Sequence, residues 1–105
     1  MKIVLISFIF STVAFNQPAH IPYHNFAISI QQYVYNEKFD SAVIDIKKKI
    51  IDNPDDPRYY FLLGSTYYWK TLFNYDDNIT NENMFLESFD KCIELYNSLF
   101  QFLLL

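Results

Sequence analysis

Apolar residues recur at steps of three and four along residues 25–102, and no other feature of the chain constrains its fold as strongly. The pattern is clearest near the C-terminus, where Phe85, Phe89, Cys92 and Tyr96 share one face of a helix with about 3.6 residues per turn. No segment combines strict apolar–polar alternation with turn-forming residues, which is the pattern of paired strands. The sequence therefore predicts an all-α fold.

Polar and proline-containing segments divide this pattern. The strongest divider is Asn-Pro-Asp-Asp-Pro at 53–57, because Pro54 ends one helix and Pro57 suits the first turn of the next, expected at about 57–72. The others are a turn at 36–37 and a polar loop at 74–83. We therefore expect two antiparallel helix pairs, with helices that begin at Asn25, at Asp40 or Ser41, at Pro57 and at Thr80 or Asn81.

Residues 1–14 have the layout of a secretory signal peptide. Lys2 supplies the positive charge, Ile3–Phe15 is largely apolar, and Thr12 and Ala14 are the small residues required before a cleavage site. The alternatives are an uncleaved membrane anchor and a buried N-terminal strand or helix. The apolar run is shorter than the roughly 20 residues that cross a bilayer, which favours the cleaved signal. We therefore predict an exported protein that meets a membrane only through this signal or anchor.

An exit segment at 15–22 is expected to follow the signal, since Pro18 and Pro22 disfavour a helix interior. His20 and His24 have the spacing of two metal ligands on one helix face, but Pro22 lies between them and no carboxylate is near in sequence. Exposed histidines are therefore expected, and no metal site. Cys92 is expected to be a buried, inert thiol, with an intermolecular disulfide as the alternative.

Composition narrows the function. Eight basic and twelve acidic residues give a net charge of −4, which argues against nucleic acid as a partner. One cysteine excludes an intramolecular disulfide or a multi-thiolate zinc site, and one glycine cannot build a phosphate-binding loop. No nucleophile, base and orienting residue occur in a recognisable set. We therefore expect a protein without catalytic activity and without a cofactor.

Two segments repeat at a period of about 34 residues. The second segment starts at Pro57 and carries Tyr60, Leu63, Gly64 and Tyr67. The first starts at Tyr23, and its Phe26 and Tyr33 correspond to Tyr60 and Tyr67. Further along it carries Phe39, Ala42 and the closing Pro54. These positions resemble the tetratricopeptide repeat, in which small residues lie where helices approach and large residues fill the space beside them. The resemblance implies an α-solenoid of two antiparallel hairpins, with one unit at 23–56 and a second at 57–102.

The chain departs from that family in three places. Ser29 and Ile30 replace the leucine–glycine pair of the first unit, and the second unit has an insertion near 74–83. Residues 103–105 are apolar and no capping helix follows. The sequence thus resembles the N-terminal portion of an exported bacterial tetratricopeptide protein, periplasmic or secreted. The alternative is a whole short protein that self-associates through the apolar C-terminal helix at 100–105.

The same resemblance implies a concave groove lined by the first helix of each unit, which would hold a protein or peptide. Tyr68 and Trp69 have the amphipathic character of binding hot spots, and Arg58 could clamp a carboxylate. The alternative is that Tyr68 and Trp69 pack against the insertion. The groove candidates are Gln31, Tyr35, Arg58, Ser65, Tyr68 and Trp69, with His24, Val34 and Phe61 beside them.

We therefore expect a non-catalytic helical-repeat scaffold that binds a protein or peptide through its concave face. Two other readings stay open at this point. One is a structural N-terminal cap, an assembly segment of a longer solenoid with no ligand of its own. The other is a small exported enzyme whose catalytic groups lie beyond Leu105.

Overall fold

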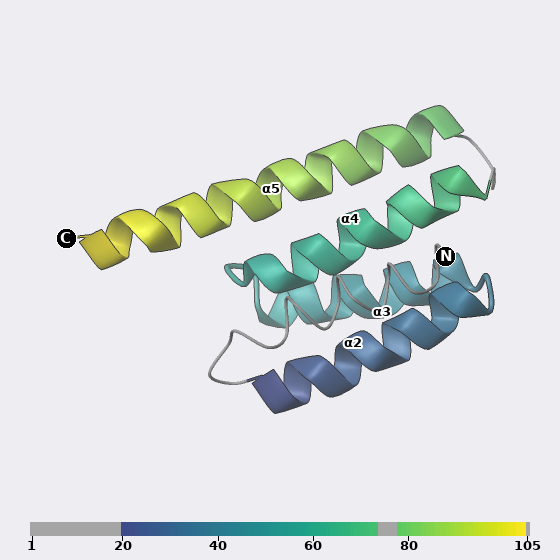
Figure 1. Cartoon of the computed structure of the whole chain (residues 1–105), viewed down its shortest axis with the longest axis horizontal. Helices are drawn as coiled ribbons and strands as arrows, with labels where there is room; N and C mark the ends of the chain where they lie inside the picture. The colour runs from purple at the N-terminus through teal and green to yellow at the C-terminus, as the bar shows by residue number, and fades with distance from the viewer. Residues whose placement is uncertain (1–19, 74–77, 105) are drawn as a thin grey trace.

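The computed structural model describes residues 20–73 and 78–104, which form four α-helices. They are α2 (His20–Tyr35), α3 (Phe39–Asp52), α4 (Pro57–Leu72) and α5 (Asn78–Leu104). Within these two ranges the chain forms no strand, so the all-α prediction is confirmed there. Consecutive helices run antiparallel (Figure 1).

Helix α4 holds the array together, because it contacts all three other helices. Its most extensive contact is with α5, which lies along it at one edge of the array, while α2 and α3 pack together on the other side of α4 (Figure 1). The helices therefore form two hairpins, α2–α3 and α4–α5, that meet through α4.

The start of α4 follows the sequence signal closely. Asp56 is the N-cap, and its Oδ1 accepts a hydrogen bond of 3.0 Å from the backbone N–H of Arg58. Pro57 occupies the first turn, where a missing N–H leaves no acceptor unpaired. The expected helix at 57–72 is therefore confirmed at both ends. In the turn between α2 and α3, Glu37 adopts a left-handed conformation with φ 58°.

Three helices begin earlier than expected. Helix α2 begins at His20 instead of Asn25, because Pro22 lies in its first turn, where proline is tolerated. The prediction of an irregular backbone around Pro22 was therefore wrong. Helix α3 begins at Phe39, one residue before Asp40. Helix α5 begins at Asn78, so the predicted polar loop at 74–83 is helical from that residue onward.

The core lies between α2, α3 and α4, and aromatic and aliphatic side chains from all three fill it. Ala42 is completely buried in it, as the repeat spacing predicts for a position where helices approach. Gly64 is buried against α5, with the ring of Phe89 over it. The remaining buried apolar residues of this core are Tyr23, Ala27, Ile30, Val34, Phe39, Ile46, Tyr59, Leu62, Leu63, Tyr67 and Trp69.

The predictions of a signal at 1–14, of an exit segment up to residue 19 and of a loop at 74–77 fall outside the described residues, as does Leu105. Among the helices at 20–72 and 78–104, none has the length and apolar content that a bilayer span requires.

Candidate binding surface

Helix α5 carries apolar side chains on a face that no other described helix covers. Ile79, Leu86, Ile93 and Phe100 follow one another at intervals of seven residues, and we call them the outer stripe. All four are exposed, with 57% of Ile93 and 63% of Phe100 accessible. Seven-residue spacing keeps side chains near one face of a helix and is the spacing at which two helices pack along each other. The outer stripe is therefore an exposed apolar strip with the spacing that helix–helix contacts use.

The adjoining face of α5 packs on α4. Ser88 and Cys92 are buried there, and Phe89 stands 5.8 Å from Phe61, measured between ring centroids. Phe89 also covers Gly64, where an added Cβ would lie 2.7 Å from its ring. Close approach of the two helices thus depends on the single glycine of the chain. Helix α4 thus covers only part of the apolar surface of α5, and the outer stripe is the part beside it that stays exposed.

Carboxylates border the outer stripe on one of its two sides, where they also line a hollow that α4 and α5 share. With about 100° between successive residues on a helix, Glu87, Asp90 and Glu94 fall beside the stripe, and all three are exposed. We call them the acidic border. Lys91 reaches Glu94 at 3.4 Å, an exposed contact that contributes little. The surface therefore joins an apolar strip to a negative edge.

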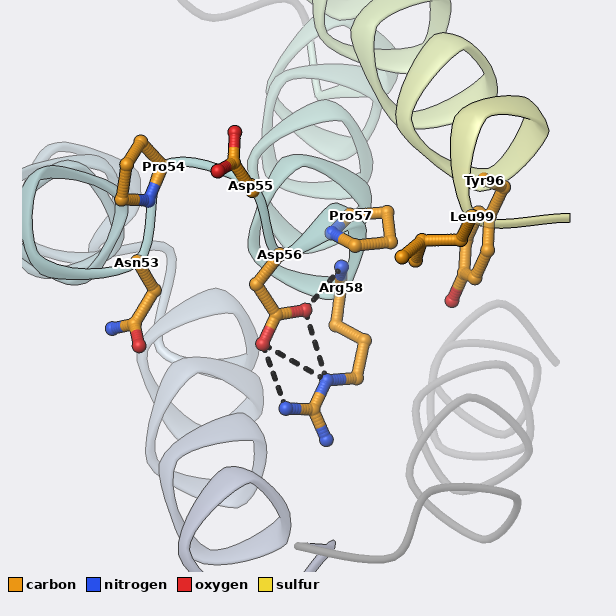
Figure 2. A pocket seen from close by; sticks show the side chains of 8 residues that line it. All are labelled: Asn53, Pro54, Asp55, Asp56, Pro57, Arg58, Tyr96 and Leu99. Carbon is orange, nitrogen blue, oxygen red and sulfur yellow. Dashed lines mark hydrogen bonds and ion pairs between the residues drawn. The ribbon is translucent and has the colours of Figure 1, made fainter. Parts of the chain in front are cut away.

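A pocket lies where α5 passes the turn between α3 and α4 (Figure 2). Its volume is about 450 Å³, and Tyr96 and Leu99 of α5 form one wall. Residues of the turn and the start of α4 form the other, namely Asn53, Pro54, Asp55, Asp56, Pro57 and Arg58. The pocket therefore adjoins the C-terminal part of the exposed face of α5.

Arg58, a sequence-predicted site residue, is held by its own helix cap. Its Nε lies 3.0 Å from Oδ1 of Asp56, and its Nη2 lies 2.7 Å from Oδ2 (Figure 2). The guanidinium also lies over the ring of Tyr23, 4.6 Å from its centroid. Asp56 thus neutralises the charge of Arg58 and accepts hydrogen bonds from Nε and Nη2, the pair of donors with which the guanidinium could bind another carboxylate. Among the described residues, the Nη1 of Arg58 and the Oη of Tyr23 are buried without a hydrogen-bond partner.

Burial controls the ionisation of the groups around this pocket. It raises the pKa of the Cys92 thiol to about 11, and the negative charge of Asp56 adds to the effect. Burial likewise raises the pKa of Tyr23, Tyr59 and Tyr96, and Asp56 adds to each of these shifts. The thiol and the phenols are therefore neutral at physiological pH, which suits packing and hydrogen bonding rather than nucleophilic chemistry.

The pKa of Cys92 predicts a slow thiol. The ordinary value of 9.0 and the native value of about 11 differ by two units, so the native thiolate fraction near pH 7 falls about a hundredfold. Labelling by iodoacetamide should therefore be at least about a hundredfold slower in the native chain than in urea. Because the native pKa is the higher one, stability should also fall as pH rises from 9 towards 11. Equal labelling rates in both states would contradict this.

Asp56 should be the polar side chain of this site on which stability depends most. Replacing it (Asp56→Ala) removes the cap of α4 and leaves the half-buried guanidinium of Arg58 without its carboxylate. We expect the free energy of unfolding to fall by about 2 kcal/mol. Urea denaturation followed by circular dichroism measures it. Asp55→Ala is the matched control, since Asp55 is exposed one residue away, and an equal loss there would refute the assignment.

The groove residues expected from the repeat resemblance do not gather at one surface. Trp69 is only 3% exposed and Ser65 is also buried, so neither is available to a partner. Tyr68 is 40% exposed, with its ring against Phe85. The alternative, that Trp69 is a packing residue, therefore fits its burial. Its ring packs beside those of Phe73 and Tyr68.

Gln31 and Tyr35 lie on α2, where the amide of Gln31 donates a hydrogen bond to the hydroxyl of Tyr35. Of the six groove candidates, Arg58 alone lines the pocket in Figure 2. The outer stripe was missed, although its seven-residue spacing is visible in the sequence. Apolar residues cover more than half the circumference of α5, and periodicity alone does not tell which of them a neighbouring helix buries.

A second hollow of about 610 Å³ lies between α4 and α5. Its lining mixes Tyr60, Leu63 and Met84 with the charged residues Glu87, Asp90, Lys91 and Glu94, and with Ser88. Residues 20–73 and 78–104 bring no three His, Cys, Asp or Glu side chains together as a metal site.

No protein-family model matches the chain, and neither the curated proteins nor the solved structures contain a match.

Proposed function

We propose that this chain is a non-catalytic helical scaffold that binds an amphipathic helix of a protein partner through the outer stripe of α5. The observation that carries the proposal is the exposure of Leu86, Ile93 and Phe100 on the part of α5 that α4 leaves uncovered. Contiguous exposed apolar side chains are costly in water and typically mark interaction surfaces. The proposal keeps the protein-binding role expected from the sequence and moves its site from the concave groove to α5.

The acidic border defines the chemistry of the partner. A helix laid along the outer stripe would have its flanking side chains beside Glu87, Asp90 and Glu94. Lysine or arginine at those flanks would be attracted, and glutamate or aspartate repelled, which supplies specificity more than affinity. The partner is thus an amphipathic helix with an apolar strip and a basic edge.

The tetratricopeptide-like solenoid and the export of the chain belong to the same proposal. The burial of Ala42 and the contact of Gly64 with α5 support repeat-like packing, because both are small residues at the positions where that family brings helices together. The sequence of residues 1–14 supports export. In a repeat stack, an uncovered face on the last helix of a hairpin pair is the place where further helices add.

The test uses two synthetic helical peptides with the same apolar strip, one with lysine flanks and one with glutamate flanks. We expect the full chain to bind the lysine peptide in a fluorescence titration and the glutamate peptide at least about tenfold more weakly. Ile93→Glu should weaken binding of the lysine peptide at least about tenfold. Ile28→Glu is the matched control, since Ile28 is exposed on α2. Equal affinity for both peptides, or no effect of Ile93→Glu, would refute the proposal.

A further inference from the structure

Helix α3 has an exposed face with the chemistry that the outer stripe of α5 requires. Ile44 and Ile51 are 55% and 77% exposed and lie seven residues apart. Lys47 and Lys48 are exposed between them, one on each side of the line that joins the two isoleucines. We call these four residues the basic stripe. It is an apolar strip with basic flanks on a helix that α5 does not cover.

The two surfaces match in spacing. Seven residues of helix rise about 10.5 Å, so Ile44 and Ile51 are separated along their axis by the same length as Leu86 and Ile93. When the isoleucine pair of α3 is placed against the apolar pair of α5, one of the two lysines lies next to the acidic border. That lysine is Lys47 or Lys48, depending on whether the two helices run parallel or antiparallel. Apolar and charged contacts are then made in one register.

The same charges disfavour each surface pairing with itself. Two copies of α5 packed antiparallel, stripe to stripe, would bring their acidic borders together, since Glu87, Asp90 and Glu94 lie on one flank of the stripe and are exposed in both copies. Two basic stripes would bring lysines together in the same way. Like charges at a packed helix interface lower affinity and select against that pairing. Complementary charge therefore favours α3 against α5.

A single copy cannot join its own two surfaces, because α4 lies between α5 and the α2–α3 hairpin (Figure 1). We infer that the helix received by the outer stripe is the basic stripe of a second copy of this chain. This inference rests on the proposed function of α5 and names the partner helix. Such a contact joins different surfaces of the two copies, so each bound copy still offers one free stripe and the assembly grows into a ring or an open stack.

Two variants separate this arrangement from a symmetric pair. Ile44→Glu with Ile51→Glu removes the basic stripe, and Leu86→Glu with Ile93→Glu removes the outer stripe. Sedimentation equilibrium of the full wild-type chain should show a mass that rises with concentration beyond two copies. Each variant alone should remain at the 12.6 kDa of one chain. An equimolar mixture should reach two copies and stop, because only one complementary contact is left.

Self-association of the Ile44→Glu, Ile51→Glu variant would overturn the inference in favour of a symmetric α5 pair. A wild-type chain that stays monomeric up to about 1 mM would overturn it outright. The peptide titration decides the proposed function separately, since it uses a helix other than α3.

A second set of variants changes only charged residues. Because the apolar residues stay in place, these variants should fold like the wild-type chain. Lys47→Glu with Lys48→Glu should lower self-association at least about tenfold, and so should Glu87→Lys with Asp90→Lys. Mixing these two variants should restore it, since the reversed charges again meet opposite charges. Failure of the mixture to associate, with each variant folded by circular dichroism, would contradict the assigned register.

Discussion

Trp69→Ala should lower the free energy of unfolding by about 3 to 5 kcal/mol, one of the two largest losses expected in this chain. The indole is 3% exposed, so truncation leaves a cavity that α4 and its neighbours can fill only in part. Domains of this size have about 5 to 15 kcal/mol of stability, so the variant should lose a large share of it and unfold at a lower temperature than the wild-type chain. Urea denaturation followed by far-ultraviolet circular dichroism measures the change.

Tyr68→Ala is the control for this experiment. Tyr68 precedes Trp69 on the same helix and touches Phe85, but 40% of it is exposed. Its loss should cost about 1 kcal/mol. If the two variants were equally stable and Trp69→Ala instead abolished binding of the lysine peptide, Trp69 would be a binding residue and its burial would have misled us.

Gly64→Leu should be the other severe substitution. A Cβ at this position would lie 2.7 Å from Cδ1 and Cε1 of Phe89, closer than carbon atoms approach without displacement. Either the ring of Phe89 leaves its place against Phe61 or α5 moves away from α4. We expect a loss of about 3 kcal/mol, despite the gain of about 1 kcal/mol that a helix makes when glycine is replaced.

A double variant identifies the cause of that loss. Phe89→Ala removes the ring and should itself be destabilising, but Gly64→Leu should cost much less in its presence. The difference is the coupling energy between the two positions, expected at about 1 to 2 kcal/mol. Strictly additive losses would mean that Gly64 is required for a reason other than the contact with Phe89.

The sequence was sufficient where local chemistry decides the outcome. Asp56 and Pro57 fix the start of α4 because a carboxylate cap and a proline in the first turn each have one favourable place at a helix N-terminus. The start of α2 could not be predicted from Pro22, because proline is tolerated both in the first turn of a helix and in an extended segment. The residues around Pro22 favour neither of the two. Ala42 was placed correctly, since a small residue among large ones marks a close approach of helices.

The candidate site could be predicted only in part. Trp69 and Ile93 are both apolar residues on amphipathic helices, and one is buried while the other is exposed. The difference comes from which helix lies next to each, and that is a property of the whole arrangement rather than of the local sequence. Arg58 was selected for its charge, yet its neighbour Asp56, two residues earlier, already binds that charge.

The unequal lengths of α4 and α5 have one more consequence. Helix α5 has 27 residues against 16 in α4, and it passes the start of α4 at Tyr96 and Leu99. The part of α5 from Phe100 onward therefore extends beyond α4, against which the rest of α5 packs (Figure 1). Backbone amides in an unsupported terminal turn open easily and exchange with solvent quickly. A ligand that settles on Phe100 would slow this exchange, so deuterium uptake at that end reports occupancy without any label on the ligand.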